Sequence, residues 1–313
     1  MTATRYFIHA AALASPKFTS SKPAAMKTVH LANDTRVRAL GQGTWRMGEN
    51  KRARKAEISA LRLGIDLGMT LIDTAEMYGD GGAEEVVAEA IAGQRDRVFV
   101  VTKAYPQNAS RTKLPRACER SLKRLRTDVV DLYLLHWREK TTPLAETVEA
   151  FEKLRAEEKI RYWGVSNFDV EDMKELFAIE NGSNCATNQV LYNLQHRQIE
   201  FELLPLVTRS PRRSHAKAGH TSPVTSLMAY SPVGHGRGLL NNTTLKRIAQ
   251  RHKAIPAQIA LAWVLRQPNV IAIPKASTEA HVRENAHSID IKLTEQDLPE
   301  LDREFPLPRT QQP

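Results

Sequence analysis

Short apolar runs alternate with amphipathic stretches along most of the chain. The runs are rich in β-branched residues, and the stretches between them repeat apolar side chains every three or four residues, which is typical of helices packed by one face. Helices are predicted over residues 53–67, 83–92, 113–126, 144–157 and 170–178. The apolar runs cover residues 37–41, 70–73, 98–102, 130–135, 161–165, 186–190, 226–230 and 270–273.

Strands that are buried on both faces and alternate with helices indicate a parallel sheet with helices outside it. Eight such units in about 260 residues fit a (β/α)8 TIM barrel, whereas six would suit a doubly wound sheet. Gly41 and Gly43 are followed by Thr44, Trp45 and Arg46, which breaks the G-x-G-x-x-G fingerprint of a Rossmann domain. We therefore predict a single TIM barrel.

The two ends of the barrel and one internal segment depart from this pattern. Two apolar stretches between residues 29 and 40 flank Asn33 and Asp34, which predicts an N-terminal β-hairpin that closes the barrel bottom. The barrel domain is expected over 28–305, after a disordered extension (1–27) and before a C-terminal tail (306–313). Residues 206–225 form an irregular basic insertion without periodicity. It is a surface insertion, a disordered loop or a stretch from another reading frame, and it could keep the seventh strand from pairing.

The net charge of +10 first suggests a polyanionic partner. Residues 1–27 and 206–227, however, each contain four Lys or Arg and no Asp or Glu, so they hold eight of the ten excess charges. The barrel is then nearly neutral, and we expect no nucleic-acid partner. No apolar run approaches the roughly 18 residues of a membrane span. Two cysteines suit a reducing compartment, and no spacing resembles a metal site. We expect a cytoplasmic monomer without metal.

Ionisable side chains follow three consecutive apolar runs. Asp73 and Tyr78 follow the second run, Lys103 the third and His136 the fourth. Singly, each has an ordinary alternative, such as a helix cap for Asp73 or a core histidine for His136. Because the carboxyl ends of barrel strands converge on one pocket, we expect the four to meet in a functional cluster.

Such a cluster suits proton transfer to a carbonyl oxygen. A Lys103 cation beside Tyr78 would lower the pKa of the phenol, and Asp73 would hold Lys103 in place. His136 could donate a hydrogen bond to the same oxygen. None of these groups supplies electrons, so the reaction needs a separate hydride source.

The sequence resembles the aldo-keto reductase family over roughly residues 28–300. The closest likeness is to bacterial enzymes that reduce small aldehydes and diketones such as methylglyoxal. The motifs stand in the family's order: GQGTW (41–45), LIDTAEMYG (71–79), VVTK (100–103), DVVDLYLLHW (128–137), GVSNF (164–168), NQVLYN (188–193), AYSP (229–232) and IPKAS (273–277) with AHVREN (280–285).

The resemblance implies an NADPH-dependent enzyme that reduces small-molecule carbonyls, with Asp73, Tyr78, Lys103 and His136 as its catalytic residues and Tyr78 as general acid. A non-catalytic NADPH-binding sensor barrel is the alternative. The resemblance also implies cofactor-binding residues: Ser166, Asn167 and Gln189 at the nicotinamide carboxamide, Tyr230 stacked on its ring, Thr44, Ser231 and Val233 along the cofactor tunnel, and Lys275, Ser277, Thr278, Glu284 and Asn285 at the adenosine end.

The 2′-phosphate site that the resemblance implies departs from the family pattern at one position. Lys275 is kept, but His281 stands where Arg is frequent, and Arg283 is expected to compensate. NADPH is therefore expected, with NADH as a weaker alternative. The substrate pocket is expected to be lined by Trp45, Met77, Tyr105 and Trp137, with Phe168 beside them.

Overall fold

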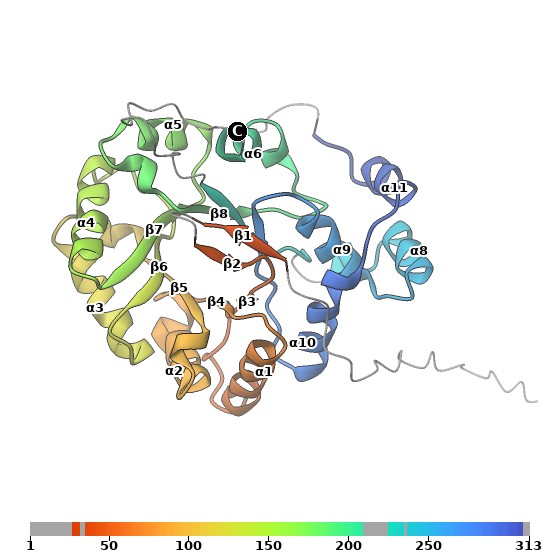
Figure 1. The fold of residues 1–313 in the computed structure, drawn as a ribbon, viewed down its shortest axis with the longest axis horizontal. Coiled ribbons are helices and arrows are strands. Elements are labelled where there is room, and N and C mark those ends of the chain that lie inside the picture. Colours follow the sequence, from red (N-terminus) through yellow and green to blue (C-terminus); the bar gives the residue numbers. More distant parts are fainter. Residues whose placement is uncertain (1–26, 32–34, 209–224, 235–236, 309–313) are drawn as a thin grey trace, which may run out of the picture.

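Eight parallel strands form one sheet at the centre of the molecule (Figure 1). The computed structural model describes residues 27–31, 35–208, 225–234 and 237–308. Each strand pairs with the next one in the chain. The strands are β3 (Gln42–Gly43), β4 (Leu71–Asp73), β5 (Phe99–Ala104), β6 (Val130–Leu135), β7 (Ile160–Ser166), β8 (Thr187–Leu191), β9 (Ser226–Tyr230) and β10 (Val270–Ala272).

The sheet closes between its first and last strands. Parallel bridges join Leu40 to Ala272 and Gly43 to Lys275. The Gly43 amide donates to the carbonyl of Pro274 at 3.0 Å, and a Cβ on Gly43 would lie 2.8 Å from the Ile273 carbonyl oxygen. Glycine therefore permits the close approach of the two strands, and the predicted (β/α)8 barrel is confirmed.

Helices surround the barrel, and all five predicted helices are present within one or two residues of their expected ends (Figure 1). In the third, Leu114, Ala117, Cys118, Ser121 and Leu125 are buried, at the spacing of one helix face. The helices are α1 (Arg54–Asp66), α2 (Gly82–Ile91), α3 (Lys113–Leu125), α4 (Leu144–Ala156), α5 (Val170–Ala178), α6 (Leu203–Thr208), α7 (Arg237–Leu240), α8 (Thr243–Arg251), α9 (Pro256–Leu265), α10 (Glu279–Ala286) and α11 (Asp297–Glu304).

The first barrel strand lies later in the chain than predicted. Arg36–Arg38 forms β2, which pairs with β1 (Thr28–His30) in the hairpin, and the barrel strand is β3. The apolar pattern missed this strand because the strand contains a polar residue, Gln42, whose side chain is nevertheless buried in the core. Its amide donates to the carbonyls of Leu61 and Met69 at 3.2 and 3.0 Å, so burial leaves no donor unsatisfied.

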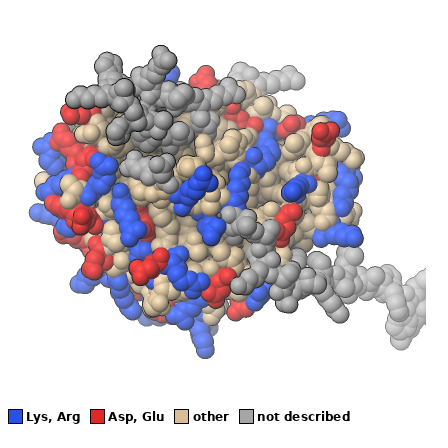
Figure 2. All heavy atoms as spheres, in the orientation of Figure 1, with Lys and Arg blue, Asp and Glu red and all other residues tan. Residues whose placement is uncertain are grey.

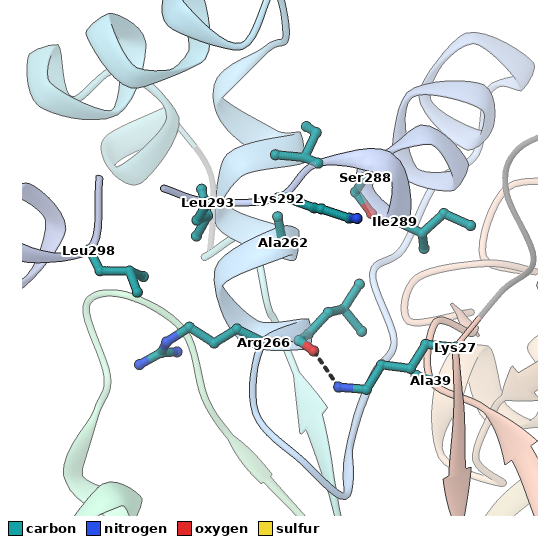
Figure 3. A pocket seen from close by; sticks show the side chains of 11 residues that line it. Lys27, Ala39, Ala262, Arg266, Ser288, Ile289, Lys292, Leu293 and Leu298 are labelled. Carbon is teal, nitrogen blue, oxygen red and sulfur yellow. Dashed lines mark hydrogen bonds between the residues drawn. The ribbon is translucent and has the colours of Figure 1, made fainter. Parts of the chain in front are cut away.

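The predicted hairpin is present and lies across the N-terminal end of the barrel (Figure 1). Lys27 precedes β1 and donates from its ammonium to the carbonyls of Leu265 and Gln267 at 2.9 and 3.2 Å, at the end of α9. These contacts border a hollow of about 280 Å³ between the hairpin, α9 and the segment before α11 (Figure 3). Lys27 is thus attached to the barrel, and only residues 1–26 of the predicted extension lie outside the described part. The predicted turn at Asn33 and Asp34 also lies outside it.

The prediction of an irregular insertion over 206–225 is wrong at both ends of this range. Residues 206–208 complete α6, and the Thr225 hydroxyl donates to the carbonyl of Cys185 at 2.9 Å. Residues 209–224 lie outside the described part. β9 pairs with β8 over five residues and with β10 over three. The insertion therefore does not keep the seventh barrel strand from pairing. No helix among the described residues is long and apolar enough to cross a membrane.

Candidate active site

A cavity of about 640 Å³ opens at the carboxyl ends of the barrel strands. Most of the residues predicted for catalysis, cofactor and substrate contribute to its wall. The lining consists of Gly43, Trp45, Arg46, Asp73, Met77, Tyr78, His136, Trp137, Ser166, Asn167, Gln189, Tyr230, Ser231, Pro232, Val233, Gly234, Ile273, Pro274 and Lys275.

A buried ion pair lies at the wall of this cavity, to which Asp73 contributes and Lys103 does not. The Lys103 ammonium lies 2.8 Å from Asp73 Oδ2 and is fully buried, and Asp73 is 2% exposed. Lys103 also donates to the Thr74 carbonyl at 2.8 Å and to the Tyr78 hydroxyl at 3.2 Å. An ammonium has three donors, so these three bonds fix its position.

Asp73 is held on its other side by Gln189. The Gln189 amide donates to Asp73 Oδ1 at 2.7 Å, so both carboxylate oxygens are bonded and Asp73 does not cap a helix. Burial raises the pKa of Asp73, and the Lys103 ammonium and the Gln189 amide oppose that rise. For Lys103, burial lowers the pKa, but Asp73 and Tyr78 outweigh it and the net change is upward. Lys103 is therefore a cation at neutral pH.

The pKa of Tyr78 is raised, contrary to the prediction from its neighbour Lys103. Burial raises the pKa of the phenol, and the Lys103 ammonium lowers it only in part. The sequence correctly predicts the direction of the lysine's effect but cannot show how deeply the ring is buried. Tyr78 consequently keeps its proton at neutral pH.

His136 lies against Tyr78 at the side of the cavity. The two rings meet edge to face with centroids 5.7 Å apart. Burial, together with the Lys103 cation, lowers the pKa of His136 to about 3. Its buried Nδ1 has no hydrogen-bond partner among the described residues. His136 is therefore neutral at physiological pH and can orient a polar group but cannot serve as a cationic acid.

The predicted nicotinamide residues form a connected group on one wall. Ser166 Oγ donates to the Gln189 carbonyl at 2.8 Å, Asn167 Nδ2 donates to the His136 carbonyl at 3.0 Å, and the Tyr230 hydroxyl donates to Asn167 Oδ1 at 3.0 Å. Ser231 and Val233 line the cavity beside them. Thr44 is buried behind the wall, where its hydroxyl donates to the Asp73 carbonyl at 3.0 Å.

The predicted adenosine residues follow β10 and lead into α10. Lys275 lines the cavity and donates from its ammonium to Ser277 Oγ at 3.2 Å. Thr278 caps α10 by accepting from the His281 amide. Arg283 lies 3.8 Å from Glu279 on the same helix. Glu284 and Asn285 also lie on α10 and do not belong to the cavity wall.

The substrate residues are only partly as predicted. Trp45, Met77 and Trp137 line the cavity, and Trp45 is half exposed at its rim. Tyr105 does not line it, and its backbone amide donates to the buried carboxylate of Glu76 at 2.6 Å. Phe168 is buried and lines a separate hollow beside α5.

Six lining residues were not assigned to the site in the sequence analysis, although four of them lie in the motifs quoted there. Arg46 directly follows the GQGTW motif, and its guanidinium lies 5.2 Å from the Trp45 ring centroid. The other five are Gly43, Pro232, Gly234, Ile273 and Pro274. Four of them adjoin predicted positions and Ile273 lies two residues before Lys275, so proximity in the sequence was the available signal. In the part of the chain that the structure describes, no three His, Cys, Asp or Glu side chains are placed to hold a metal ion.

Comparisons with known proteins agree with this geometry. The profile described as the Aldo/keto reductase family matches residues 39–304. Methylglyoxal reductase YeaE of Escherichia coli is 50% identical over 287 residues, which cover 90% of this chain and 96% of that protein. A 9,11-endoperoxide prostaglandin H2 reductase of Trypanosoma cruzi is 33% identical, covering 88% of this chain and 90% of that protein.

Among solved structures, an aldo/keto reductase from Klebsiella pneumoniae in complex with NADP and acetate superposes with a TM-score of 0.85. The two sequences are 49% identical, and the match covers 92% of this chain and 98% of that one.

Proposed function

This chain belongs to the aldo/keto reductase family, and from that premise we propose that it reduces small aldehydes such as methylglyoxal with NADPH, using Tyr78 as the general acid. The observation that carries the proposal is the Tyr78 hydroxyl, which lies 3.2 Å from the buried Lys103 ammonium in the wall of the strand-end cavity. NADPH supplies the hydride, and the remaining chemistry falls to this chain's own side chains.

The proton transfer follows from the buried geometry. Tyr78 is protonated at neutral pH, so it can donate its proton to the carbonyl oxygen as negative charge develops there. The phenolate left behind is stabilised by Lys103, whose attraction is strong because its ammonium is fully buried. Asp73 holds Lys103 in place, and neutral His136 orients the carbonyl. A proton donor placed in this way contributes roughly 10²–10⁴ in rate.

The cofactor assignment fits the polar groups of the wall. Ser166, Asn167 and Gln189 present amide and hydroxyl groups suited to a nicotinamide carboxamide, and Tyr230 offers an aromatic face. Lys275 and the N-terminus of α10, capped by Thr278, suit a phosphate, because helix N-termini and cations both attract anions. Ser277, Arg283, Glu284 and Asn285 are proposed to contact the adenosine end.

The substrate assignment rests on the cavity rim and on relatives. Trp45, Met77 and Trp137 give an apolar rim around a buried proton donor, which favours small, partly apolar carbonyl compounds. The E. coli relative is a methylglyoxal reductase and the Klebsiella relative binds NADP. We propose that the 28–305 domain acts as a monomer in the cytoplasm. Its two cysteines, Cys118 and Cys185, are buried and are not joined in a disulfide, as a reducing compartment allows.

The test is NADPH oxidation against methylglyoxal, other short aldehydes and ketoses, with Tyr78→Phe as the decisive variant. We expect the variant to bind NADPH with unchanged affinity and to lose about 100-fold or more in turnover. Turnover near the wild-type value would refute the role of Tyr78. NADPH binding without oxidation by any carbonyl of the panel would instead favour the non-catalytic sensor.

A further inference from the structure

Two buried carboxylates lie close to the proposed acid, Tyr78, in the sequence and take no part in the Lys103–Asp73 ion pair. Glu76 is 6% exposed and Glu84 is fully buried. Both belong to the segment from β4 to α2, which also carries Tyr78: Glu76 precedes Tyr78 by two residues, and Glu84 follows it by six. Burying a carboxylate is costly unless its oxygens are bonded, so the partners of each one are informative.

Glu76 is bonded to the chain that follows Lys103. Its Oε1 accepts from the Tyr105 amide at 2.6 Å and from Asn108 Nδ2 at 2.9 Å. The Glu76 amide in turn donates to the carbonyl of Lys103 at 3.2 Å. Glu76 therefore ties the loop that carries Tyr78 to the end of β5.

Glu84 is bonded to the chain just before Lys103. The Thr102 hydroxyl donates to Glu84 Oε1 at 2.6 Å. On its other side, Glu84 Oε2 accepts from Arg124 Nε at 2.5 Å. Glu84 therefore ties α2 to β5 and to α3 at once.

Arg124 connects the two carboxylates. Its Nη2 lies 4.0 Å from Glu76 Oε2, and Arg120 Nη2 lies 3.5 Å from the same oxygen. Gly81, with a φ of +90°, leaves room for this side chain, because a Cβ there would lie 2.5 Å from Arg124. Glu76, Glu84 and Arg124 thus form a clamp that holds the β4–α2 segment to β5 on both sides of Lys103.

We infer that Glu76 and Glu84 are positioning residues, which set the separation of the Tyr78 hydroxyl from the Lys103 ammonium. The inference rests on the proposed role of Tyr78. Well-packed apolar residues can stabilise a core as well as a buried ion pair does, so stability alone does not call for these carboxylates. A displacement of about 1 Å between reacting groups can reduce a rate by about 100-fold. The clamp gives the buried charges of Glu76 and Glu84 a role, which is to fix the distance between Tyr78 and Lys103.

The test compares Glu76→Gln and Glu84→Gln with Glu85→Gln. Glu85 lies beside Glu84 on α2 but is half exposed and paired only with Arg54 in the described structure. We expect kcat to fall about tenfold or more in the first two variants and to stay within about twofold in the control. NADPH affinity should be unchanged in all three, because none of these residues lines the cavity.

The alkaline limb is the fall of kcat/KM at high pH. Its position separates a positioning role of Glu76 and Glu84 from a simple loss of their negative charge. The titratable groups that face Tyr78 are Lys103, Asp73, His136 and Tyr230. If Lys103 moves away, it lowers the pKa of Tyr78 less, so the alkaline limb shifts to higher pH. Removing a nearby negative charge without any movement would shift the limb to lower pH.

Thr102→Val provides a variant that leaves every charge in place. It removes the hydrogen bond that the Thr102 hydroxyl donates to Glu84, and we expect a smaller fall in kcat with the same upward shift of the alkaline limb. Melting temperatures that fall while kcat and the limb stay at wild-type values would overturn the inference, as would a downward shift. A wild-type enzyme that reduces no carbonyl would instead refute the proposed function.

Discussion

Two opposing effects act on the proton of Tyr78. Burial holds it on the phenol, and the Lys103 cation weakens that hold without reversing it. The same surroundings remove the positive charge from His136. Lys103 is a cation next to the acid that must lose its proton, and His136 is a neutral imidazole beside it. This arrangement suits the delivery of one proton to an oxygen.

The pH dependence of kcat/KM follows from these two shifts. Tyr78 acts only while protonated, and its pKa is raised, so activity should persist across neutral pH and fall only on the alkaline side of the ordinary phenol pKa. Because the pKa of His136 is about 3, its titration should leave no inflection between pH ~5 and ~8. An acid limb in that range that disappears in His136→Gln would show that the histidine is charged during catalysis.

The Lys103–Asp73 pair should also contribute to the free energy of unfolding. Lys103→Met leaves the Asp73 carboxylate buried without its cation, and breaking a buried pair in this way typically destabilises a protein by about 3–5 kcal/mol. Urea denaturation measures the loss. Arg97→Met is the control, since the Arg97–Asp66 pair is more than half exposed and should contribute less than about 1 kcal/mol. Equal losses in the two variants would contradict the argument.

Lys275 tests the preference between the two nicotinamide cofactors. Lys275→Met should raise the Kd for NADPH more than the Kd for NADH, because only NADPH carries the 2′-phosphate that a cation would hold. Fluorescence titration of both cofactors gives the two constants. Equal changes would place the phosphate elsewhere, and a parallel Arg283→Met variant shows whether Arg283 shares the contact.

At the scale of elements, β9 owes its place to its neighbours. It pairs with β8 and β10 on its two sides, and four of its five residues are buried. These contacts involve none of residues 209–224. The strand that ends at Tyr230 is therefore specified by the barrel around it.

Replacing residues 209–224 by a Gly/Ser linker tests this independence. We expect the melting temperature and kcat to stay close to wild type, because changes in loop length cost little free energy. Circular dichroism and the carbonyl assay measure both. Loss of folded protein with linkers of several lengths would show that the segment contributes to the barrel.

For the whole molecule, one cavity is lined by strand ends and loops that are distant in the sequence. It draws on positions from Gly43 to Lys275, so it exists only when the barrel is closed. The excess positive charge, by contrast, belongs mostly to residues 1–27 and 206–227 of the sequence, and Figure 2 shows Lys and Arg interspersed with Asp and Glu over the described part of one face. Binding at the cavity should therefore be coupled to global stability.

NADPH should accordingly raise the melting temperature of the whole chain. A ligand that binds only the folded state at a concentration of 100 times its Kd stabilises that state by about 2.7 kcal/mol. For a domain of this size, that is a shift of several degrees. Scanning calorimetry at increasing NADPH concentration measures it, and Lys275→Met should need more NADPH for the same shift. A melting temperature independent of NADPH would contradict a cavity that binds it.

The sequence by itself determined the barrel, most helix ends and the four side chains at its mouth. Apolar periodicity reports burial of each element directly, and parallel strands deliver their carboxyl ends to one place. Only the tertiary structure decided that Gln42 lies in a buried strand, that Tyr105 is bonded to Glu76 outside the cavity, and that burial outweighs Lys103 at Tyr78. Each of these depends on desolvation and on contacts between residues far apart in the chain, and both arise only when the elements pack.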